Sequence, residues 1–178
     1  DSRALGSLIR EIDESNPLYV VDVGASGGVE AFWQLFQPKL LVDAFDPLIA
    51  EVERLNRDAE NGVTYWSAFV DGGPTNKSLI FPNPEDVALQ AFEYTTAAEY
   101  RRLMDVDYTQ ETYNQGAQVV LADTRLSLDE FLKSHSRPMP NFVKIDTDGS
   151  DILVLWGAGS VLDSELCFGV QVECQFHG

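Results

Sequence analysis

The sequence alternates short apolar runs, rich in β-branched residues, with segments of helical periodicity. This alternation is typical of βαβ units and predicts a mostly parallel sheet. Five core strands are expected, at residues 18–24, 40–45, 63–70, 141–146 and 169–176. The first of them is apolar along nearly its whole length, as a central strand buried on both faces should be. The chain is therefore predicted to be a doubly wound, Rossmann-like α/β fold.

Several segments before and between these strands carry apolar residues at helical spacing. A leading helix is expected at residues 5–12, packed on the sheet. A second helix is expected to bury four residues on one face: Val29, Phe32, Trp33 and Phe36. Pro47 can open the next helix, because proline is favoured at the first helical position. Ser127 and Glu130 have the spacing of a capping box at the start of a fourth helix, and residues 150–156 predict a fifth.

The middle of the chain is less regular. Residues 78–81 and 119–122 are expected to be edge strands, and residues 83–116 form a polar, tyrosine-rich stretch with a helical segment at 97–104. Long polar insertions in compact domains are usually functional or mobile. The stretch is interpreted as an insertion or a lid within a single domain that spans residues 1–178.

Charge limits the partners that this chain can have. Its 12 Lys and Arg against 29 Asp and Glu give a net charge of −17, which disfavours nucleic acids and anionic membranes. No apolar run has the 18 or so residues of a membrane helix, and the first ten residues lack the layout of a signal peptide. A cytoplasmic protein is expected. Cys167 and Cys174 fit neither a redox motif nor a zinc site and are interpreted as reduced, packed thiols.

A glycine-rich turn follows the first strand, in the sequence Asp22-Val23-Gly24-Ala25-Ser26-Gly27-Gly28. A turn between a buried strand and a helix is where open α/β sheets bind nucleotides. Asp46 ends the second strand, 22 residues after Gly24, where a carboxylate can accept hydrogen bonds from both hydroxyls of a ribose. A structural interpretation stays open, because an aspartate before Pro47 is also a good helix cap and Gly24 and Gly28 can be ordinary turn glycines.

Such a turn can serve a dinucleotide or S-adenosylmethionine. A short-chain dehydrogenase would have a further glycine at the position of Glu30 and a tyrosine followed four residues later by lysine. None of the six tyrosines has a lysine at that distance. Asp22, two residues before the first glycine, can order the turn and face the cationic amino-acid end of S-adenosylmethionine. This position favours a methyltransferase over a dehydrogenase.

Three blocks of this sequence resemble the FkbM-type S-adenosylmethionine-dependent methyltransferases. They are residues 21–28, residues 44–47, with the sequence Ala-Phe-Asp-Pro, and residues 142–158, the most distinctive block. Residues 127–129 and 170–173 resemble two shorter motifs of the same family. The chain departs from the family in having Ser26 where asparagine is more frequent, and aspartate where glutamate is more frequent at positions 46, 148 and 151.

The resemblance implies a class I methyltransferase fold and S-adenosylmethionine as the cofactor. The residues that it assigns to the amino-acid part of the cofactor lie in the glycine-rich turn: Asp22, Gly24, Ala25, Ser26 and Gly28. It assigns the ribose to Asp46. Such folds end in an antiparallel strand pair after the fifth strand, whereas only His177 and Gly178 follow here. The last strand pair is therefore expected to be missing, or the chain to be truncated.

Family members of this type are associated with O-methylation, so the implied substrate is a hydroxyl group on a small metabolite, sugar or polyketide. An alcohol must lose its proton during methyl transfer, and a carboxylate or an imidazole can accept it. Asp146, at the end of the fourth core strand, is the first candidate for this role. Glu173 and His177 follow it, although His177 can also be only a solvated tail residue.

Two further expectations concern the charged residues of this region. Asp146, Asp148, Asp151 and Glu173 could form a carboxylate cluster that suits magnesium or calcium. The alternative, which we favour, is that Asp148 and Asp151 only complement the dipole of the following helix, so no metal ligand is assigned. Lys144 stands in an apolar strand and is expected to pair with a carboxylate such as Glu173.

Two other functions stay open at this stage. One is a nicotinamide-dependent oxidoreductase of Rossmann type, disfavoured by the missing tyrosine and lysine pair. The other is a cofactor-binding or interaction module without catalytic activity, which the short end of the sequence keeps open. The sequence does not fix the oligomeric state.

Overall fold

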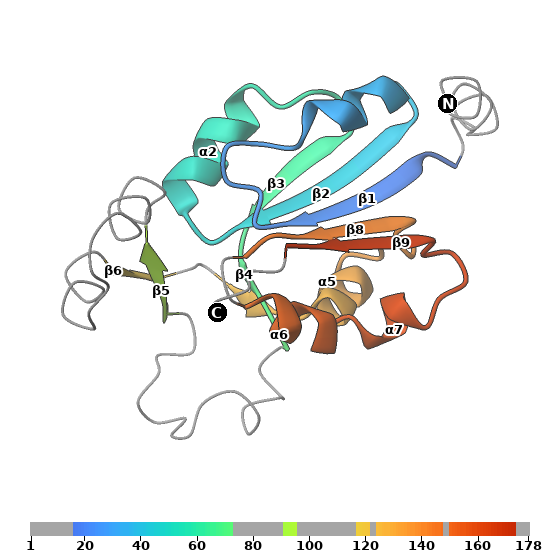
Figure 1. Ribbon diagram of the computed structural model, residues 1–178. Coiled ribbons are helices and arrows are strands. Elements are labelled where there is room, and N and C mark those ends of the chain that lie inside the picture. Colours follow the sequence, from blue (N-terminus) through green and yellow to red (C-terminus); the bar gives the residue numbers. More distant parts are fainter. Residues whose placement is uncertain (1–15, 73–90, 96–116, 122–123, 148–149, 174–178) are drawn as a thin grey trace.

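The computed structural model describes residues 16–72, 91–95, 117–121, 124–147 and 150–173. Its main sheet consists of five parallel strands in the order β3-β2-β1-β8-β9 (Figure 1). The strands are β1 (Leu18–Val23), β2 (Leu40–Asp46), β3 (Val63–Ser67), β8 (Phe142–Ile145) and β9 (Gly169–Val172). Each lies where a core strand was predicted, although β3 and β9 are shorter than expected, so the prediction of a mostly parallel α/β sheet is confirmed.

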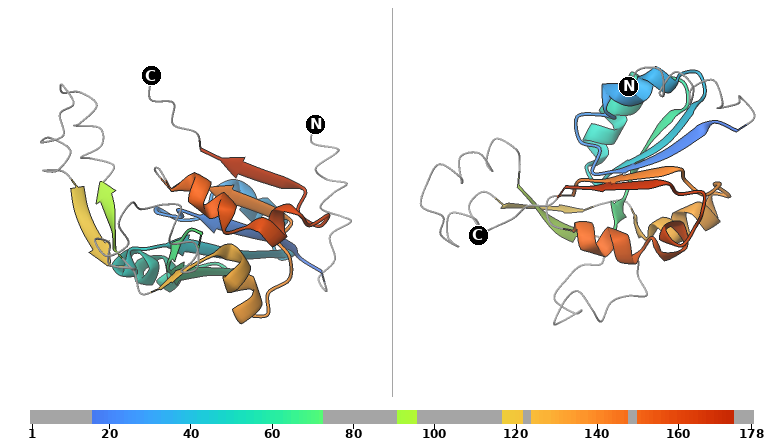
Figure 2. Two further views of the ribbon diagram at one scale, coloured as in Figure 1. Left: turned by 90° about the horizontal axis from the view of Figure 1, so that it is seen from below. Right: turned by 45° about the vertical axis from the view of Figure 1, so that its right-hand side comes forward.

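Helices cover both faces of this sheet (Figures 1 and 2). The 3₁₀ helix η1 (Ala31–Phe36) and helix α2 (Ile49–Arg57) lie on one face. Helices α5 (Leu128–Ser134), α6 (Asp151–Trp156) and α7 (Gly159–Leu162) lie on the other. A parallel sheet between two helical layers is a Rossmann-like α/β architecture.

Strand β1 shows how the pleat divides the core into two parts. Its residues are all buried, and alternate side chains point to opposite faces. Tyr19, Val21 and Val23 pack in the cluster that contains Phe131 of α5. Leu18 and Val20 pack in the second cluster, with the aromatic residues of η1 and the apolar side of α2. The central strand therefore holds both helical layers to the sheet.

The helix predicted after β1 differs in type and in its buried side. It is a 3₁₀ helix over Ala31–Phe36, in which residues three apart are eclipsed. Trp33 and Phe36 are therefore buried together, at 8% and 3% exposure, while Phe32 is 49% exposed. The prediction that Phe32 lies on the buried face was wrong because it assumed 3.6 residues per turn.

The predicted third strand is interrupted at Ala68. After β3 ends, β4 (Phe69–Val70) leaves the main sheet and pairs with β7 (Arg125–Leu126) in a separate two-stranded parallel sheet. The strand expected near residues 119–122 is β6 (Ala117–Leu121), which pairs antiparallel with β5 (Ala91–Thr95). β6 is therefore part of a ribbon beside the main sheet and not one of its edge strands (Figure 1).

The capping box before α5 is confirmed. The Ser127 hydroxyl accepts a hydrogen bond from the Glu130 amide, and the Glu130 carboxylate accepts one from the Ser127 amide. This reciprocal pair satisfies two amides that a helix start leaves without partners. The predicted helix at residues 150–156 is α6, with Ser150 as its N-cap and Gly157 as its C-cap.

Other predictions fall outside the described residues. These are the leading helix at 5–12, the edge strand at 78–81, the insertion at 83–116 apart from β5, and Cys174 and His177. Cys167 is a free thiol, as expected. None of the helices in the described ranges has the length and apolar character needed to cross a bilayer.

Candidate functional site

The strand order reverses where β1 and β8 lie side by side. From β1 the chain moves outward through β2 to β3, and the other half of the sheet continues through β8 to β9. In open α/β sheets, ligands bind outside the carboxyl ends of the strands at such a reversal. The candidate site therefore consists of the residues that end β1, β2 and β8.

The start of the glycine-rich turn is fixed by close backbone packing. Gly24 has a φ of +85°, and a Cβ atom added there would lie 1.7 Å from the carbonyl oxygen of Asp146. The amides of Gly24 and Ala25 both donate to the carbonyl oxygen of Phe45, at 3.0 and 2.9 Å. Only glycine fits at position 24, because its bare Cα lets the end of β1 lie directly against β8.

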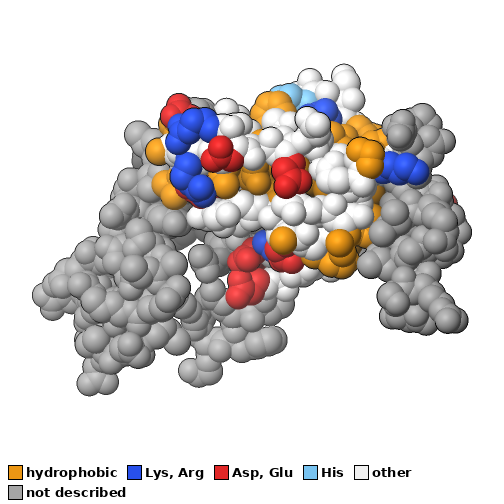
Figure 3. All heavy atoms as spheres, turned by 90° about the horizontal axis from the view of Figure 1, so that it is seen from above, with side chains coloured by type: hydrophobic (Ala, Val, Ile, Leu, Met, Phe, Trp, Pro, Cys, Tyr) orange, Lys and Arg blue, Asp and Glu red, His pale blue; other side chains and the backbone are white. Residues whose placement is uncertain are grey.

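The second half of the turn is held by two side chains that the sequence analysis did not identify. The Gly27 amide donates to Oε1 of Glu51 at 3.0 Å, and the Val29 amide donates to the Tyr65 hydroxyl at 3.1 Å. Glu51 also pairs with Arg54, which with the hydrogen bond from Gly27 holds the pKa of Glu51 at about 2. Arg54 and Glu51 both belong to α2. Figure 3 shows the molecule from above, with basic and acidic side chains lying close together near one end of the described part. Ser26 is exposed at the turn.

Asp22, Lys144 and Asp146 form a triad beneath the turn. The Lys144 ammonium lies 3.3 Å from Oδ1 of Asp22 and 3.3 Å from Oδ2 of Asp146. The side chains of Asp22 and Lys144 are 1% and 10% exposed, and that of Asp146 is 36% exposed. Lys144 was expected to pair with a carboxylate such as Glu173, but its ammonium lies between these two aspartates.

Burial and pairing shift the pKa values within the triad. Burial raises the pKa of Asp22, and the nearby Lys144 partly offsets this rise. Burial by itself would lower the pKa of Lys144, but the two aspartates outweigh it and the pKa is raised. Lys144 is therefore protonated at neutral pH. The triad thus sets one positive charge against two acidic side chains.

One oxygen of the triad has no partner. Oδ2 of Asp22 is buried and makes no hydrogen bond within the part of the chain that the structure describes. Burying a charged acceptor without a hydrogen bond is costly, so such groups call for an explanation. A ligand that donates to this oxygen would supply the missing bond.

Asp46 ends β2 on the same face as Asp22 and is 3% exposed. Its Oδ1 accepts a hydrogen bond of 2.7 Å from the Leu48 amide at the start of α2. The sequence left open that Asp46 caps a helix opened by Pro47, but α2 begins at Ile49 with Leu48 as its N-cap and without a side-chain cap. Asp46 therefore bonds the turn before the helix, and its second carboxylate oxygen takes no part in this bond. Burial raises the pKa of Asp46 to about 6, although the Leu48 amide opposes the rise.

This raised pKa predicts a pH dependence of stability that Asp46→Asn should remove. The folded state holds the Asp46 proton more tightly than the unfolded chain, where the pKa is 3.8. Its stabilising contribution is therefore complete below about pH 3.8 and is lost as the pH rises through 6. Between pH 4 and 7, wild type should lose at most about 3 kcal/mol relative to Asp46→Asn in urea unfolding. The side-chain oxygen of asparagine can also accept the hydrogen bond from the Leu48 amide, so parallel pH profiles for the two proteins would contradict the prediction.

The three catalytic candidates are placed unequally. Asp146 follows β8, and Glu173 follows the neighbouring β9 and donates its amide to the Ile145 carbonyl oxygen at 3.0 Å. Both residues therefore lie at the carboxyl edge of the sheet, Asp146 within the triad and Glu173 at the end of the neighbouring strand. His177 lies outside the described residues.

The possible carboxylate cluster lies partly outside the described residues. Oδ1 of Asp151 accepts hydrogen bonds of 2.9 Å from the amide and the hydroxyl of Thr147, which fits a structural role before α6. Among the described residues, no group of three or more candidate ligands is arranged to hold a metal ion. Asp148 is outside these residues.

A cavity of about 210 Å³ lies between η1, α2 and β3. Trp33, Leu55 and Tyr65 are among the residues that line it, and Gly28 is the only predicted cofactor residue that does so. Pockets for small ligands usually have about 300–1,000 Å³. The cavity is therefore smaller than a usual ligand pocket, and the carboxyl edge of the sheet remains the candidate site.

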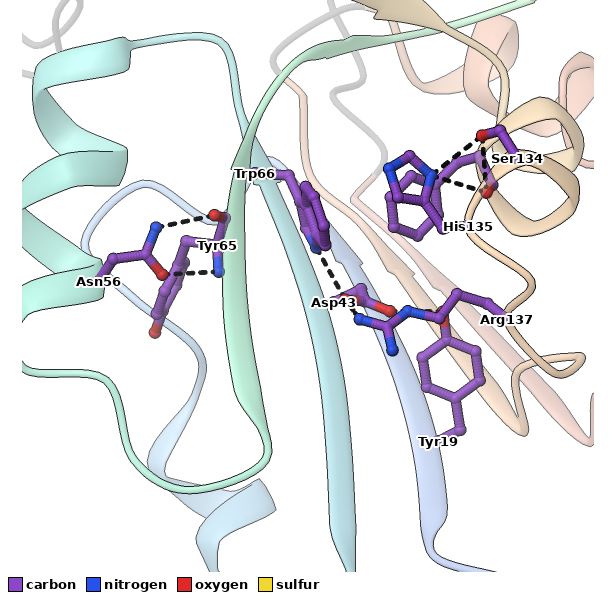
Figure 4. A network of polar contacts seen from close by, with 9 residues as sticks. Tyr19, Asp43, Asn56, Tyr65, Trp66, Ser134, His135 and Arg137 are labelled. Atoms are coloured by element: carbon purple, nitrogen blue, oxygen red, sulfur yellow. Dashed lines mark hydrogen bonds and ion pairs between the residues drawn. The ribbon is translucent and has the colours of Figure 1, made fainter.

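The opposite face of the sheet holds a second polar cluster, shown in Figure 4. Asp43 of β2 is fully buried and accepts three hydrogen bonds, from the Tyr19 hydroxyl, the Trp66 indole and the Arg137 guanidinium. Beside it, the His135 ring stacks on Phe131 with 4.4 Å between ring centroids. The three hydrogen bonds of Asp43 join β2 to β1, to β3 and to Arg137 after α5, so the cluster is structural.

Comparisons with known proteins add no relatives. No family model matches the sequence, no curated protein matches it, and no solved structure matches it. Function must therefore be argued from the residues of the candidate site themselves.

Proposed function

We propose that this protein is an S-adenosylmethionine-dependent methyltransferase of the class I type, acting on a hydroxyl group. The observation that carries the proposal is the buried, unpartnered oxygen of Asp22, directly beneath the turn of Gly24 at the strand-order reversal. The resemblance of residues 21–28, 44–47 and 142–158 to the FkbM-type methyltransferases supports the same assignment. A cytoplasmic location is part of the proposal, on the sequence grounds given above.

The residues present fit this cofactor by charge. The amino-acid end of S-adenosylmethionine carries an ammonium group, which can donate to the free Oδ2 of Asp22. Asp46 has a second oxygen available for a ribose hydroxyl, next to the one that accepts the Leu48 amide. The two acidic side chains of the triad suit a molecule whose sulfur is also positive.

The chemistry asks little of the protein beyond alignment. S-adenosylmethionine supplies a methyl group activated by its positive sulfur. Transfer breaks the sulfur–carbon bond, forms a carbon–oxygen bond to the hydroxyl substrate and releases the hydroxyl proton. Holding the two partners in line accounts for most of the acceleration in such a reaction. Asp146, about one-third exposed at the carboxyl edge of the sheet, can accept the proton. Glu173 lies at the end of the neighbouring strand β9.

Thermal unfolding with two different ligands tests the cofactor assignment. S-adenosylhomocysteine at about 100 times its dissociation constant should raise the midpoint by about 5–10 °C, and NAD should leave it unchanged. A shift with NAD alone would favour the oxidoreductase. No shift with either ligand would contradict cofactor binding altogether.

Catalysis requires a separate measurement, because a non-catalytic module could also bind the cofactor. Transfer of a labelled methyl group to a panel of hydroxyl-bearing sugars and small metabolites is expected, and Asp146→Asn should reduce it by about 10²–10⁴-fold. Binding without transfer to any acceptor would favour the module.

A further inference from the structure

Lys144 links the two carboxylates to which the proposed function gives separate duties. It lies on β8 between Asp22 of β1 and Asp146, 3.3 Å from an oxygen of each. Lysine is uncommon in the interior of a sheet, because its ammonium is costly to bury without partners. The sequence of β8 is otherwise apolar, so the position calls for a reason.

The surroundings of Asp22 provide that reason. The residue has no solvent exposure, and within the described chain Lys144 is the only group that donates to its carboxylate. Among the described residues, the other titratable groups that act on Asp22 are acidic. Asp146 from β8 and Glu30 from the turn after β1 both act on Asp22 electrostatically, and Glu173 lies at the end of β9. The ionised form of Asp22 therefore depends on Lys144.

We propose that Lys144 is a positioning residue that keeps Asp22 ionised, so that the free Oδ2 of Asp22 accepts the ammonium group of the cofactor's amino-acid end. The inference rests on the proposed function and deepens it. Lys144 itself bonds Oδ1, which leaves Oδ2 free for the ligand. The role needs the positive charge of Lys144 and not merely its volume.

Without this charge, a fully buried aspartate among acidic neighbours would take up a proton. Binding of a ligand ammonium would then require Asp22 to release that proton. The affinity of a Lys144→Met variant should therefore rise with pH, by up to about tenfold per pH unit below the new pKa of Asp22. In wild type, where Asp22 is already ionised, this dependence is absent.

The test is calorimetric titration of the full chain with S-adenosylhomocysteine at several pH values between 7 and 8.5. Asp46 is ionised throughout this window, and the amino group of the ligand titrates equally in every protein. Relative to wild type, Lys144→Met should bind at least about tenfold more weakly at pH 7, and this deficit should shrink as the pH rises. Lys144→Arg should restore a constant affinity ratio to wild type. Lys133→Met, which removes an exposed lysine of α5, should behave as wild type.

Two aspartate variants identify the titrating group and cover the case in which Lys144→Met fails to fold. Asp22→Asn should bind at least about tenfold more weakly than wild type, with a ratio that does not change with pH. Asp146→Asn retains the pair of Lys144 and Asp22 and should show no new pH dependence. A constant deficit in Lys144→Met, or full affinity in Asp22→Asn, would overturn the inference. Failure of wild type to bind the ligand would instead overturn the proposed function.

Discussion

Gly24→Ala is expected to destroy ligand binding and to destabilise the fold, whereas Gly27→Ala is expected to do neither to the same extent. Both glycines have a φ near +85°, so alanine meets a similar backbone penalty of about 1–2 kcal/mol at each. At Gly24 the added Cβ would also lie 1.7 Å from the Asp146 carbonyl oxygen, while at Gly27 nothing lies within 4 Å. The clash is with backbone, so β1 and β8 must move apart.

Overpacking of this kind adds about 1–3 kcal/mol. Urea unfolding should therefore show Gly24→Ala to be less stable than Gly27→Ala by about that amount. Thermal shift with S-adenosylhomocysteine should be lost in Gly24→Ala and retained in Gly27→Ala, because the strand ends carry Asp22 and Asp146. Equal stability and equal shifts in the two variants would contradict the geometry described for the turn.

The parts of the fold that the sequence predicts are those whose signals are local. Strand β1 and the capping box of α5 depend on residues within a few positions, and both are observed as predicted. The side of η1 that is buried depends on the type of helix, which the spacing of Phe32 and Trp33 does not reveal. The break at Ala68 depends on pairing of β4 with β7, more than 50 residues further along the chain.

The candidate site follows the same division. Asp22, Gly24 and Asp46 were identified from a turn and a strand that are close in sequence, and the structure brings them to one edge of the sheet. Lys144 pairs with carboxylates, as expected, but the sequence did not indicate Asp22 as one of them, because Asp22 lies 122 residues away. Glu51 and Tyr65, which hold the turn, look like ordinary helix and strand residues until the turn is folded against them.

Asp43 was missed for the same reason. Within β2 it is a single acid among apolar residues, and no local pattern marks it. Its three donors lie 24, 23 and 94 residues away, on Tyr19, Trp66 and Arg137. Burial and the charge of Asp43 raise the pKa of Tyr19 well above its usual range, so the phenol stays protonated and donates.

Asp43→Asn is accordingly expected to lower the free energy of unfolding by about 3 kcal/mol, near the lower end for breaking a buried ion pair. The lower end of that range applies because the Arg137 side chain is 26% exposed, so the pair is only partly buried. For a chain of this size the loss corresponds to a fall of about 6–12 °C in the thermal midpoint. The exposed Asp163→Asn, the same chemical change on the surface, should stay within about 0.5 kcal/mol of wild type.

A double mutant separates the network from a general loss of packing. If Asp43 and Arg137 act on each other, Asp43→Asn combined with Arg137→Met should cost at least about 0.5 kcal/mol less than the two single costs added together. The thermal shift with S-adenosylhomocysteine should persist in every variant that folds, because Asp43 faces the opposite side of the sheet from Asp22. Strict additivity, or an Asp43→Asn protein as stable as Asp163→Asn, would show that the three donors do not depend on the Asp43 charge.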